Sequence, residues 1–421
     1  MSSSSNRFHY AWIILIVGTS VVFGSLGLAR FGYSMVLPSM QEGLHMGNAQ
    51  AGALATANLI GYLALSVIGG ALAARYGPRT VITIGLTIAG VGMMLTATAG
   101  GFVSAAVWRA LVGVGSGVSN VPVMGLLSAW FGARRRGLAT GVAVAGSSVA
   151  LILLGATVPL IMTTYGQNGW RVSWYIFGGL TLVLAVAALL LLRNRPADVG
   201  QRPLGTNEGD PEGGRAADAL HWGAVYRSGL VWHLGLVYVA FGFSYIIYMT
   251  FFVKFLMAEG GYSQSAAGGL FMTMGWFSLF CGLIWGGISD LTGRRWALVI
   301  VYLIQVVSFG LFGIRTGPLG LTVSAILFGL TAWSIPAIMA AGCGDILGGR
   351  LAPAGLGFIT LFFGIGQAAG PSIAGAIADA AGSLHPAFLL AAAVSFLGAA
   401  GSWLLPGTSR GKHSQMLDCR T

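Results

Sequence analysis

Charged residues are scarce in this chain of 421 residues, and acidic residues are scarcer than basic ones. Asp, Glu, Lys and Arg together make up 8% of the chain, whereas a soluble domain carries about 25%. Hydrophobic residues make up 56%, and the mean hydropathy is +0.81. A single soluble core could not bury this much apolar surface, so the sequence predicts a chain embedded in a lipid bilayer.

Cysteine and histidine are also few. The three cysteines, Cys281, Cys343 and Cys419, show neither a pairing pattern nor metal-ligand spacing, so the sequence predicts no disulfides and no metal site. The six histidines lie at or beyond the ends of the apolar segments. An enzyme would need clustered histidines, paired acids or a nucleophile with a base inside the membrane. A membrane-embedded enzyme or receptor is therefore a distant alternative, and no cofactor is expected.

Long apolar runs dominate the rest of the chain. Most of them reach the ~20 residues that a helix needs to cross a bilayer. The first run continues without a clear cleavage site, so we interpret it as a retained span and not as a signal peptide. We predict an all-α membrane protein with twelve transmembrane helices at 10–37, 50–73, 80–98, 102–128, 138–160, 172–192, 230–254, 266–289, 296–314, 318–341, 355–377 and 386–405.

One long polar stretch separates the sixth apolar run from the seventh. It contains LGTNEGDPEGGRAADAL, whose charge, Gly and Pro content favours a flexible linker. The predicted organisation has four parts: an N-terminal six-helix bundle at 1–192, a cytoplasmic linker at 193–229, a C-terminal six-helix bundle at 230–405 and a cytoplasmic tail at 406–421.

The distribution of basic residues predicts the orientation. Most of the 22 Lys and Arg residues fall on the side of the membrane that holds the N-terminus. By the positive-inside rule, this side is cytoplasmic, which predicts that both termini lie in the cytoplasm. The net charge of +11 is explained by this topology and does not require a nucleic-acid partner. We expect a monomer in the lipid bilayer.

A short Gly-flanked basic turn occurs twice. GGALAARYGPRT (69–80) and WGGISDLTGRRW (285–296) superpose when Ala74 is placed on Asp290, an offset of 216 residues. Both copies follow the second apolar run of their own half of the chain. The repeat therefore indicates two related six-span halves.

This pattern resembles the major facilitator superfamily of secondary transporters, whose cytoplasmic loop signature runs Gly-x-Leu-Ala-Asp-Arg-x-Gly-Arg-Arg/Lys. The signature residues present here are Gly70, Arg75, Gly77 and Arg79 in the first copy and Gly286, Asp290, Gly293, Arg294 and Arg295 in the second. The resemblance implies that these residues form a cytoplasmic gate between the halves. Because Ala74 replaces the acid of the first copy, Asp290 is the better candidate for the charged half of this gate.

Other stretches extend the resemblance along the chain. RALVGVGSG (109–117) resembles the fourth-span motif of the superfamily, and WFGARRRGLATGVAVAGSSVA (130–150) resembles its monocarboxylate-porter branch and bacterial relatives. The resemblance implies two bundles that rock around a midplane site to give alternating access. It also implies a small monocarboxylate-like organic anion as the solute, moved with protons, without a cofactor.

Arg30 is the candidate for binding the anion. If the first span ends near Pro38, Arg30 lies inside the membrane and shares a helix face with Tyr33. A guanidinium suits the task because its fixed fork of donors matches carboxylate oxygens. In anion-transporting members of the superfamily, a first-span cation at this depth binds the substrate. The alternative is that Arg30 snorkels to the outer interface or has a structural role.

Further polar residues within the spans are weaker candidates. For substrate binding they are Asn120, Tyr245, Tyr248 and Gln367; for coupling or structure they are Arg109, Asn58 and Lys254. Arg109 could be a hydrogen-bond hub, a coupling residue or a solute contact. Lys254 could equally snorkel at the outer surface, and the tyrosines could simply pack between helices.

No Asp or Glu lies deep within a predicted span. A buried carboxylate is the usual proton carrier in membrane transporters, so its absence weakens a simple proton-symport mechanism. A weak-acid substrate could itself carry the proton. The absence also disfavours the nearer alternative, an efflux transporter for hydrophobic or cationic compounds, which typically needs an intramembrane acid.

Overall fold

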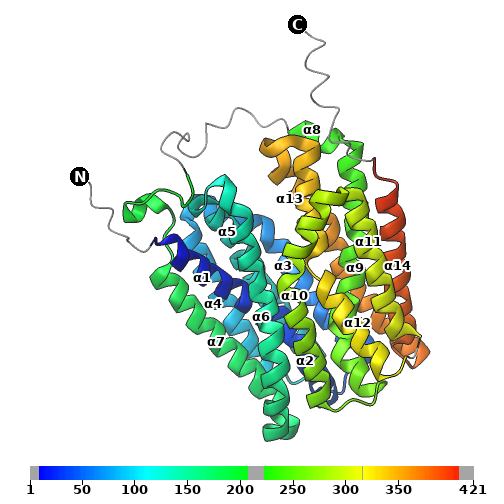
Figure 1. The fold of residues 1–421 in the computed structure, drawn as a ribbon. Coiled ribbons are helices and arrows are strands. Elements are labelled where there is room, and N and C mark those ends of the chain that lie inside the picture. Colours follow the sequence, from blue (N-terminus) through cyan, green and yellow to red (C-terminus); the bar gives the residue numbers. More distant parts are fainter. Residues whose placement is uncertain (1–8, 207–221, 315, 407–421) are drawn as a thin grey trace.

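The computed structural model describes residues 9–206, 222–314 and 316–406. This part of the chain is helical almost throughout, in two bundles that lie side by side (Figure 1). The first bundle contains α1 (Ala11–Val22), η1 (Phe23–Phe31), α2 (Gly32–Gly43), α3 (Asn48–Tyr76), α4 (Pro78–Ala97), α5 (Phe102–Trp130), α6 (Ala133–Tyr165), η2 (Gly166–Asn168) and α7 (Gly169–Leu191). The second contains α9 (Gly229–Ala258), α10 (Gln264–Thr292), α11 (Arg294–Gly313), α12 (Pro318–Thr331), α13 (Ser334–Ala381) and α14 (His385–Trp403).

The helices confirm the predicted multi-pass membrane protein. In the described residues, 9 helical segments are long and apolar enough to cross a membrane, and 2 bent helix pairs raise this number to 11. One of these segments, Arg135–Leu191, contains both α6 and α7. Counted as two crossings, α6 and α7 complete the twelve spans that the apolar runs predict.

The first span is longer and less regular than expected. The sequence predicts its end near Pro38, but α2 continues through Pro38 to Gly43. Before it, η1 forms a nine-residue π-helix, a rare conformation that is frequent at functional sites. The apolar pattern of the segment does not distinguish a π-helix from an α-helix. Because α2 continues to Gly43, Arg30 lies well inside the first span.

The residues after α7 pack on the first bundle. Here η3 (Pro196–Val199) is followed by Leu204, whose N–H donates to the Trp130 carbonyl at 2.9 Å and whose carbonyl accepts from Gly132 N–H at 3.0 Å. The first part of the predicted linker is thus attached to the ends of α5 and α6. Residues 207–221, which contain most of the predicted flexible stretch, lie outside the described residues, and α8 (Trp222–Arg227) follows them.

Glycines let the helices of a bundle touch at their backbones. A Cβ atom at Gly113 of α5 would lie 1.9 Å from the carbonyl oxygen of Asn58 in α3, and one at Gly61 of α3 would lie 2.2 Å from that of Ala110. These distances are impossible for real Cβ atoms, so only glycine permits this packing of α3 on α5. Such small-residue contacts are a common means of helix association in membranes.

The two bundles meet mainly through α3 with α13 and α6 with α10. We call the end of the molecule that carries the 69–80 and 285–296 turns the basic end, and the end with the turn between α2 and α3 (residues 44–47) the closed end. The bundles converge toward the closed end and diverge toward the basic end (Figure 1). Close to the closed end, a Cβ at Gly52 would lie 2.0 Å from the carbonyl oxygen of Pro371.

The α3–α5 contact gives a first test. We expect Gly113→Ala to lower the melting temperature of the purified protein, because the added methyl group must push two backbones apart. Overpacking of this kind costs about 1–3 kcal/mol. Gly125→Ala is the matched control in the same helix, since a methyl group added there would meet no atom within 4 Å. Equal melting temperatures for the two variants would contradict this account of the packing.

Candidate functional site

Arg109 of α5 lies in the interior of the first bundle, with 1% of its surface exposed. Its Nη1 donates to the carbonyl oxygen of Ala29 in η1 at 2.7 Å. The guanidinium also lies over the rings of Tyr33, at 4.8 Å, and Trp174, at 4.9 Å. A backbone acceptor and two aromatic faces thus partly compensate the burial of this charge, and its Nε is buried without a hydrogen-bond partner among the described residues. Of the three roles open for Arg109, these contacts favour that of a structural hub.

Arg30 of η1 is held differently. Its guanidinium lies 4.6 Å from the centre of the Tyr62 ring, and its Nε and Nη2 are buried without a hydrogen-bond partner among the described residues. These two nitrogens form one edge of the guanidinium, with two parallel N–H groups. Leaving buried donors unpaired is costly. Arg30 therefore presents an unused fork of the kind that binds a carboxylate.

A small cavity lies beside the two arginines, where the bundles meet. The space that the centre of a water molecule can occupy there is about 10 Å³, close to the room for one water. The first bundle contributes Arg30, Tyr33, Asn58 and Arg109 to its wall, and the second contributes Ile246, Met249 and Thr250. The structure thus brings four of the predicted residues together around one space between the bundles.

Two more predicted residues approach Arg30 from the second bundle. The Tyr245 hydroxyl of α9 lies beside the Arg30 side chain and accepts a hydrogen bond from Gln367 Nε2 of α13. The Tyr245 ring stacks on Phe241 at 4.7 Å and on Phe363 at 5.8 Å. Tyr245 therefore faces the arginine of the first bundle, and Gln367 contacts the site through the Tyr245 hydroxyl.

Tyr62 is a site residue that the sequence reasoning missed. Its ring covers Arg30, and its hydroxyl accepts a hydrogen bond from Asn120 Nδ2 at 3.0 Å. Asn120 thus contacts the site through Tyr62. The sequence does contain a pattern that indicates Tyr62. Asn58, Tyr62 and Ser66 follow one another at intervals of four residues, so these polar side chains share a face of α3.

Tyr248 lies apart from these residues. Its hydroxyl pairs with Ser324 Oγ at 2.8 Å, and its ring contacts Phe309 and Phe328 at 5.0 Å and 4.6 Å. These partners belong to α11 and α12, inside the second bundle. The structure therefore places Tyr248 in an aromatic core and not beside Arg30.

Lys254 takes part in a contact between the bundles at the closed end. Its Nζ donates to the side-chain oxygens of Gln41 in α2 and Asn48 in α3. Because both oxygens belong to the first bundle, these hydrogen bonds favour a structural role for Lys254 over snorkelling at the outer surface.

Asp379 reinforces this contact. Its two carboxylate oxygens, at the end of α13, accept hydrogen bonds from the backbone N–H groups of Asn48 and Ala49, both at 2.8 Å. These are the first free N–H groups of α3, and the residue that precedes them, Gly47, has no side chain to cap them. The second bundle thus supplies the helix cap of the first, which locks the closed end.

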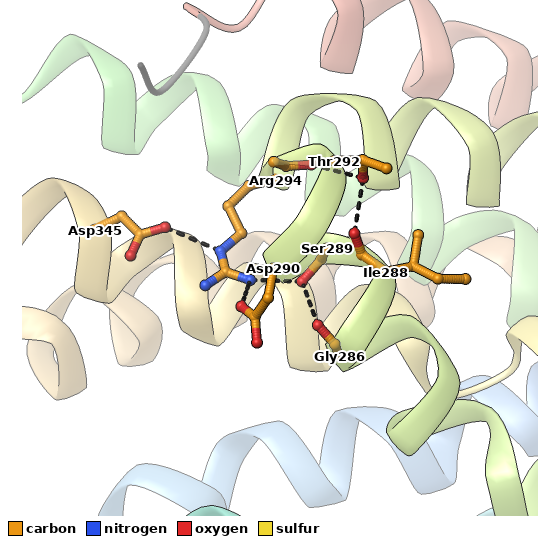
Figure 2. A network of polar contacts seen from close by, with 8 residues as sticks. Gly286, Ile288, Ser289, Asp290, Thr292, Arg294 and Asp345 are labelled. Atoms are coloured by element: carbon orange, nitrogen blue, oxygen red, sulfur yellow. Dashed lines mark hydrogen bonds and ion pairs between the residues drawn. The ribbon is translucent and has the colours of Figure 1, made fainter. Parts of the chain in front are cut away.

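The two predicted gate turns lie at the basic end. Gly77 and Gly293 both have a φ of 86°, which favours glycine, and each ends one helix and precedes the next. In the second copy, Arg294 Nη1 donates to Asp290 at 2.6 Å and its Nε donates to Asp345 at 2.9 Å (Figure 2). Arg294 Nη1 also donates to Ser289 Oγ at 2.5 Å.

Among the residues that the structure describes, the first copy forms no such charged network, because Ala74 occupies the position of Asp290. Arg79 Nε donates instead to the Leu189 carbonyl at 2.7 Å, and the Arg75 guanidinium lies over the Tyr76 ring at 5.4 Å. Gly70 lies in α3, more than one turn before Arg75, and Gly286 lies in α10, where its carbonyl accepts from Ser289 Oγ at 3.1 Å (Figure 2). Within the described residues, each hydrogen bond and ion pair of the turns stays in its own bundle.

The family comparison identifies this architecture. Residues 22–402 match the family described as "Uncharacterised MFS-type transporter YbfB". The chain belongs to this family of MFS-type transporters. Membership confirms the predicted superfamily, and it places the chain among transporters and not among enzymes.

Curated relatives support this assignment at low identity. The hexuronate transporter of Bacillus subtilis (strain 168) is 23% identical over 377 residues, which cover 86% of this chain and 87% of the relative. The probable sulfoacetate transporter SauU of Cupriavidus necator is 24% identical, with 89% of each chain covered. Monocarboxylate transporter 2 of Meriones unguiculatus is 23% identical over 94% of this chain and 84% of its own.

Solved structures of transporters share the fold. A bacterial homolog of the human lysosomal transporter Spinster, in an inward-facing and unoccupied conformation, superposes with a TM-score of 0.76 at 16% identity, covering 96% of this chain and 98% of its own. The nucleoside transporter NupG gives a TM-score of 0.70 at 14% identity, covering 94% of this chain and 98% of its own. At these identities the likeness establishes the fold of this MFS-type transporter.

The cap that Asp379 supplies to α3 gives a second test. Loss of a helix cap costs about 1 kcal/mol, so Asp379→Ala should weaken the closed end and increase its opening about fivefold. The measurement is the rate of thiol labelling of a cysteine introduced at Thr56, which donates to the Ala368 carbonyl across the bundles, in a cysteine-free background. Glu259→Ala is the matched control, because Glu259 caps Leu384 N–H within the second bundle. Equal labelling rates in the two variants would refute the locking role of Asp379.

The separate positions of Tyr245 and Tyr248 give a third test. Tyr248→Phe should reduce stability by about 1 kcal/mol, through the lost hydrogen bond to Ser324, and leave the KM of transport unchanged. Tyr245→Phe should raise KM, because the hydroxyl beside Arg30 is removed. Both are read from uptake assays and melting curves of the same preparations. A raised KM in the Tyr248 variant alone would overturn this division.

Proposed function

We propose that this MFS-type transporter moves a small organic anion with a carboxylate group, and that Arg30 binds that carboxylate. The observation that carries the proposal is the free Nε–Nη2 edge of Arg30, buried where the two bundles meet. A carboxylate can accept from both N–H groups at once, which satisfies the two donors and neutralises the charge. Tyr62 shields one face of the guanidinium, while Tyr245 and Gln367 supply polar contacts from the opposite bundle.

The names of the relatives support an organic anion. Hexuronate, sulfoacetate and monocarboxylates all carry at least one carboxylate, and one such group suits the single free guanidinium edge at this site. The efflux of cations is less compatible with this centre. Arg30 and Arg109 lie side by side there, and their positive potential repels a cationic solute.

Alternating access follows from the asymmetry between the two ends of the molecule. We infer from the positive-inside rule that the basic end faces the cytoplasm of an inner membrane and that the chain acts as a monomer. The bundles are held together at the closed end by Lys254 and Asp379, whereas the hydrogen bonds and ion pairs of the gate turns, among the described residues, stay within their own bundles. This arrangement corresponds to access from the cytoplasm. Rocking of the bundles would break the contacts at the closed end and bring the gate turns of the two bundles together at the basic end.

The proton has a route that needs no intramembrane acid. Among the described residues, Glu42, Glu259 and Asp379 lie at the ends of α2, α9 and α13, and Asp290 and Asp345 pair with Arg294 at the basic end. A carboxylate at Arg30 can take a proton from the water on the side where the solute enters and return it to the water on the side where the solute leaves, so the acid itself carries the proton across. We therefore propose proton-linked transport in which the solute is the proton carrier.

The role of Arg30 gives a fourth test, in proteoliposomes loaded for counterflow of labelled monocarboxylates. Arg30→Gln should weaken solute affinity by ten- to hundredfold, since hydrogen bonds to charged groups contribute about 1.5–3 kcal/mol. Arg30→Lys should recover part of this loss, because it keeps the charge without the fork. Arg171→Gln is the control, as Arg171 donates to the carbonyls of Ala97 and Ala99 near the closed end.

Three outcomes decide between the candidate functions. Carboxylate uptake that depends on Arg30 supports the proposal. Uptake of carboxylates with unchanged affinity in Arg30→Gln would remove Arg30 from the site. Uptake of cationic dyes alone would replace the proposal by the efflux function.

A further inference from the structure

A second cavity lies within the second bundle, at the basic end. Its volume of about 130 Å³ is large enough for a group of several atoms. Most of its wall is apolar, and three charged residues lie at its margin. The wall consists of Leu230, Leu234, Arg294, Arg295, Leu298, Ile338, Gly342, Asp345, Ile346, Leu405 and Pro406.

The two arginines of this cavity differ in how they are used. Arg294 is neutralised by Asp290 and Asp345, at 2.6 Å and 2.9 Å. Arg295 has no acidic partner in the described part of the chain, and its Nε is buried without a hydrogen bond there. Asp345 is engaged by Arg294, so Arg295 supplies the unbalanced charge of the cavity wall.

The internal repeat shows what Arg295 lacks. Arg79 occupies the corresponding position in the first bundle, and its Nε donates to the Leu189 carbonyl near the end of α7 at 2.7 Å. The helix that corresponds to α7 is α14, the last of its bundle. No carbonyl of α14 or of the residues that follow it to Pro406 bonds Arg295 Nε, and Leu405 and Pro406 line the cavity instead. The second bundle thus leaves open a position that the first bundle fills with its own backbone.

Tryptophans mark the depth of this cavity in the membrane. The Arg295 guanidinium lies 5.4 Å from the ring of Trp296 and 5.7 Å from that of Trp403. These two residues are 48% and 53% exposed. Exposed tryptophans at the end of a transmembrane helix gather at the level of the lipid headgroups.

We propose that this cavity binds the phosphate group of an anionic membrane lipid, with Arg295 as its donor. The phosphate accepts from Arg295 Nε, the apolar wall accommodates the glycerol region, and the two tryptophans flank the acyl chains. All of the lining residues belong to the second bundle or to the residues that directly follow it. The site is therefore separate from the Arg30 site, and it does not depend on the identity of the transported solute.

The test uses the full-length protein purified in a mild detergent. Three probes are added separately: phosphatidylglycerol, phosphatidylcholine and inorganic phosphate. Native mass spectrometry counts the bound lipids, and melting curves give the stabilisation. The variant is Arg295→Gln, and the matched control is Arg75→Gln, which removes an arginine that lies over an exposed tyrosine at the same end but lines no such cavity.

We expect the wild type and Arg75→Gln to retain one phosphatidylglycerol more tightly than phosphatidylcholine. Arg295→Gln should reduce this retention at least fivefold, and Arg295→Lys should restore part of it. The mass measurement remains decisive if the variant melts at a lower temperature. Equal retention by Arg295→Gln and the wild type would overturn the proposal, and a full response to inorganic phosphate alone would assign the site to a soluble anion.

Discussion

The hydrogen bond from Arg109 to the carbonyl oxygen of Ala29 is the interaction on which the centre of this molecule depends. A charge inside a membrane is costly unless its surroundings stabilise it, and here one carbonyl and two aromatic rings do so, although Arg109 Nε has no hydrogen-bond partner among the described residues. The bond ties α5 to the π-helix η1 at the residue before Arg30. It thereby fixes where Arg30 lies. Because Arg109, and not Arg30, bonds the Ala29 carbonyl, the Nε–Nη2 edge of Arg30 stays free for a solute.

The spans and the two basic turns could be predicted because each depends on local chemistry. An apolar run of sufficient length must form a helix in lipid, and Gly77 and Gly293 permit the sharp turns between helices. The course of the first span could not be predicted in this way. A proline such as Pro38 removes one hydrogen bond, but whether the helix ends there depends on the neighbouring helices, which the local sequence does not describe.

Within the candidate site, the residues of the first span and of α5 were predictable as ionisable groups inside the membrane. The partners across the bundles were not, since they depend on tertiary packing. Asp379 caps a helix that begins 331 residues earlier in the chain, and Tyr248 and Tyr245 differ by less than one turn but face different surroundings. The difference between the two gate turns, with an acid only in the second, could be predicted from Ala74 and Asp290. The different hydrogen bonding of Arg79 Nε and Arg295 Nε could not, because it depends on where α7 and α14 lie.

The glycines at the junction of the bundles have a mechanical consequence. Gly52 faces the Pro371 backbone, Gly155 and Gly268 face each other's carbonyls, and Gly375 faces Asn48. Surfaces formed by backbone atoms have no long side chains that interlock, so the bundles can slide apart there without rotamer changes. The polar bonds that cross the junction, among them those of Lys254 and Asp379, must then exchange their protein partners for water before the bundles can separate.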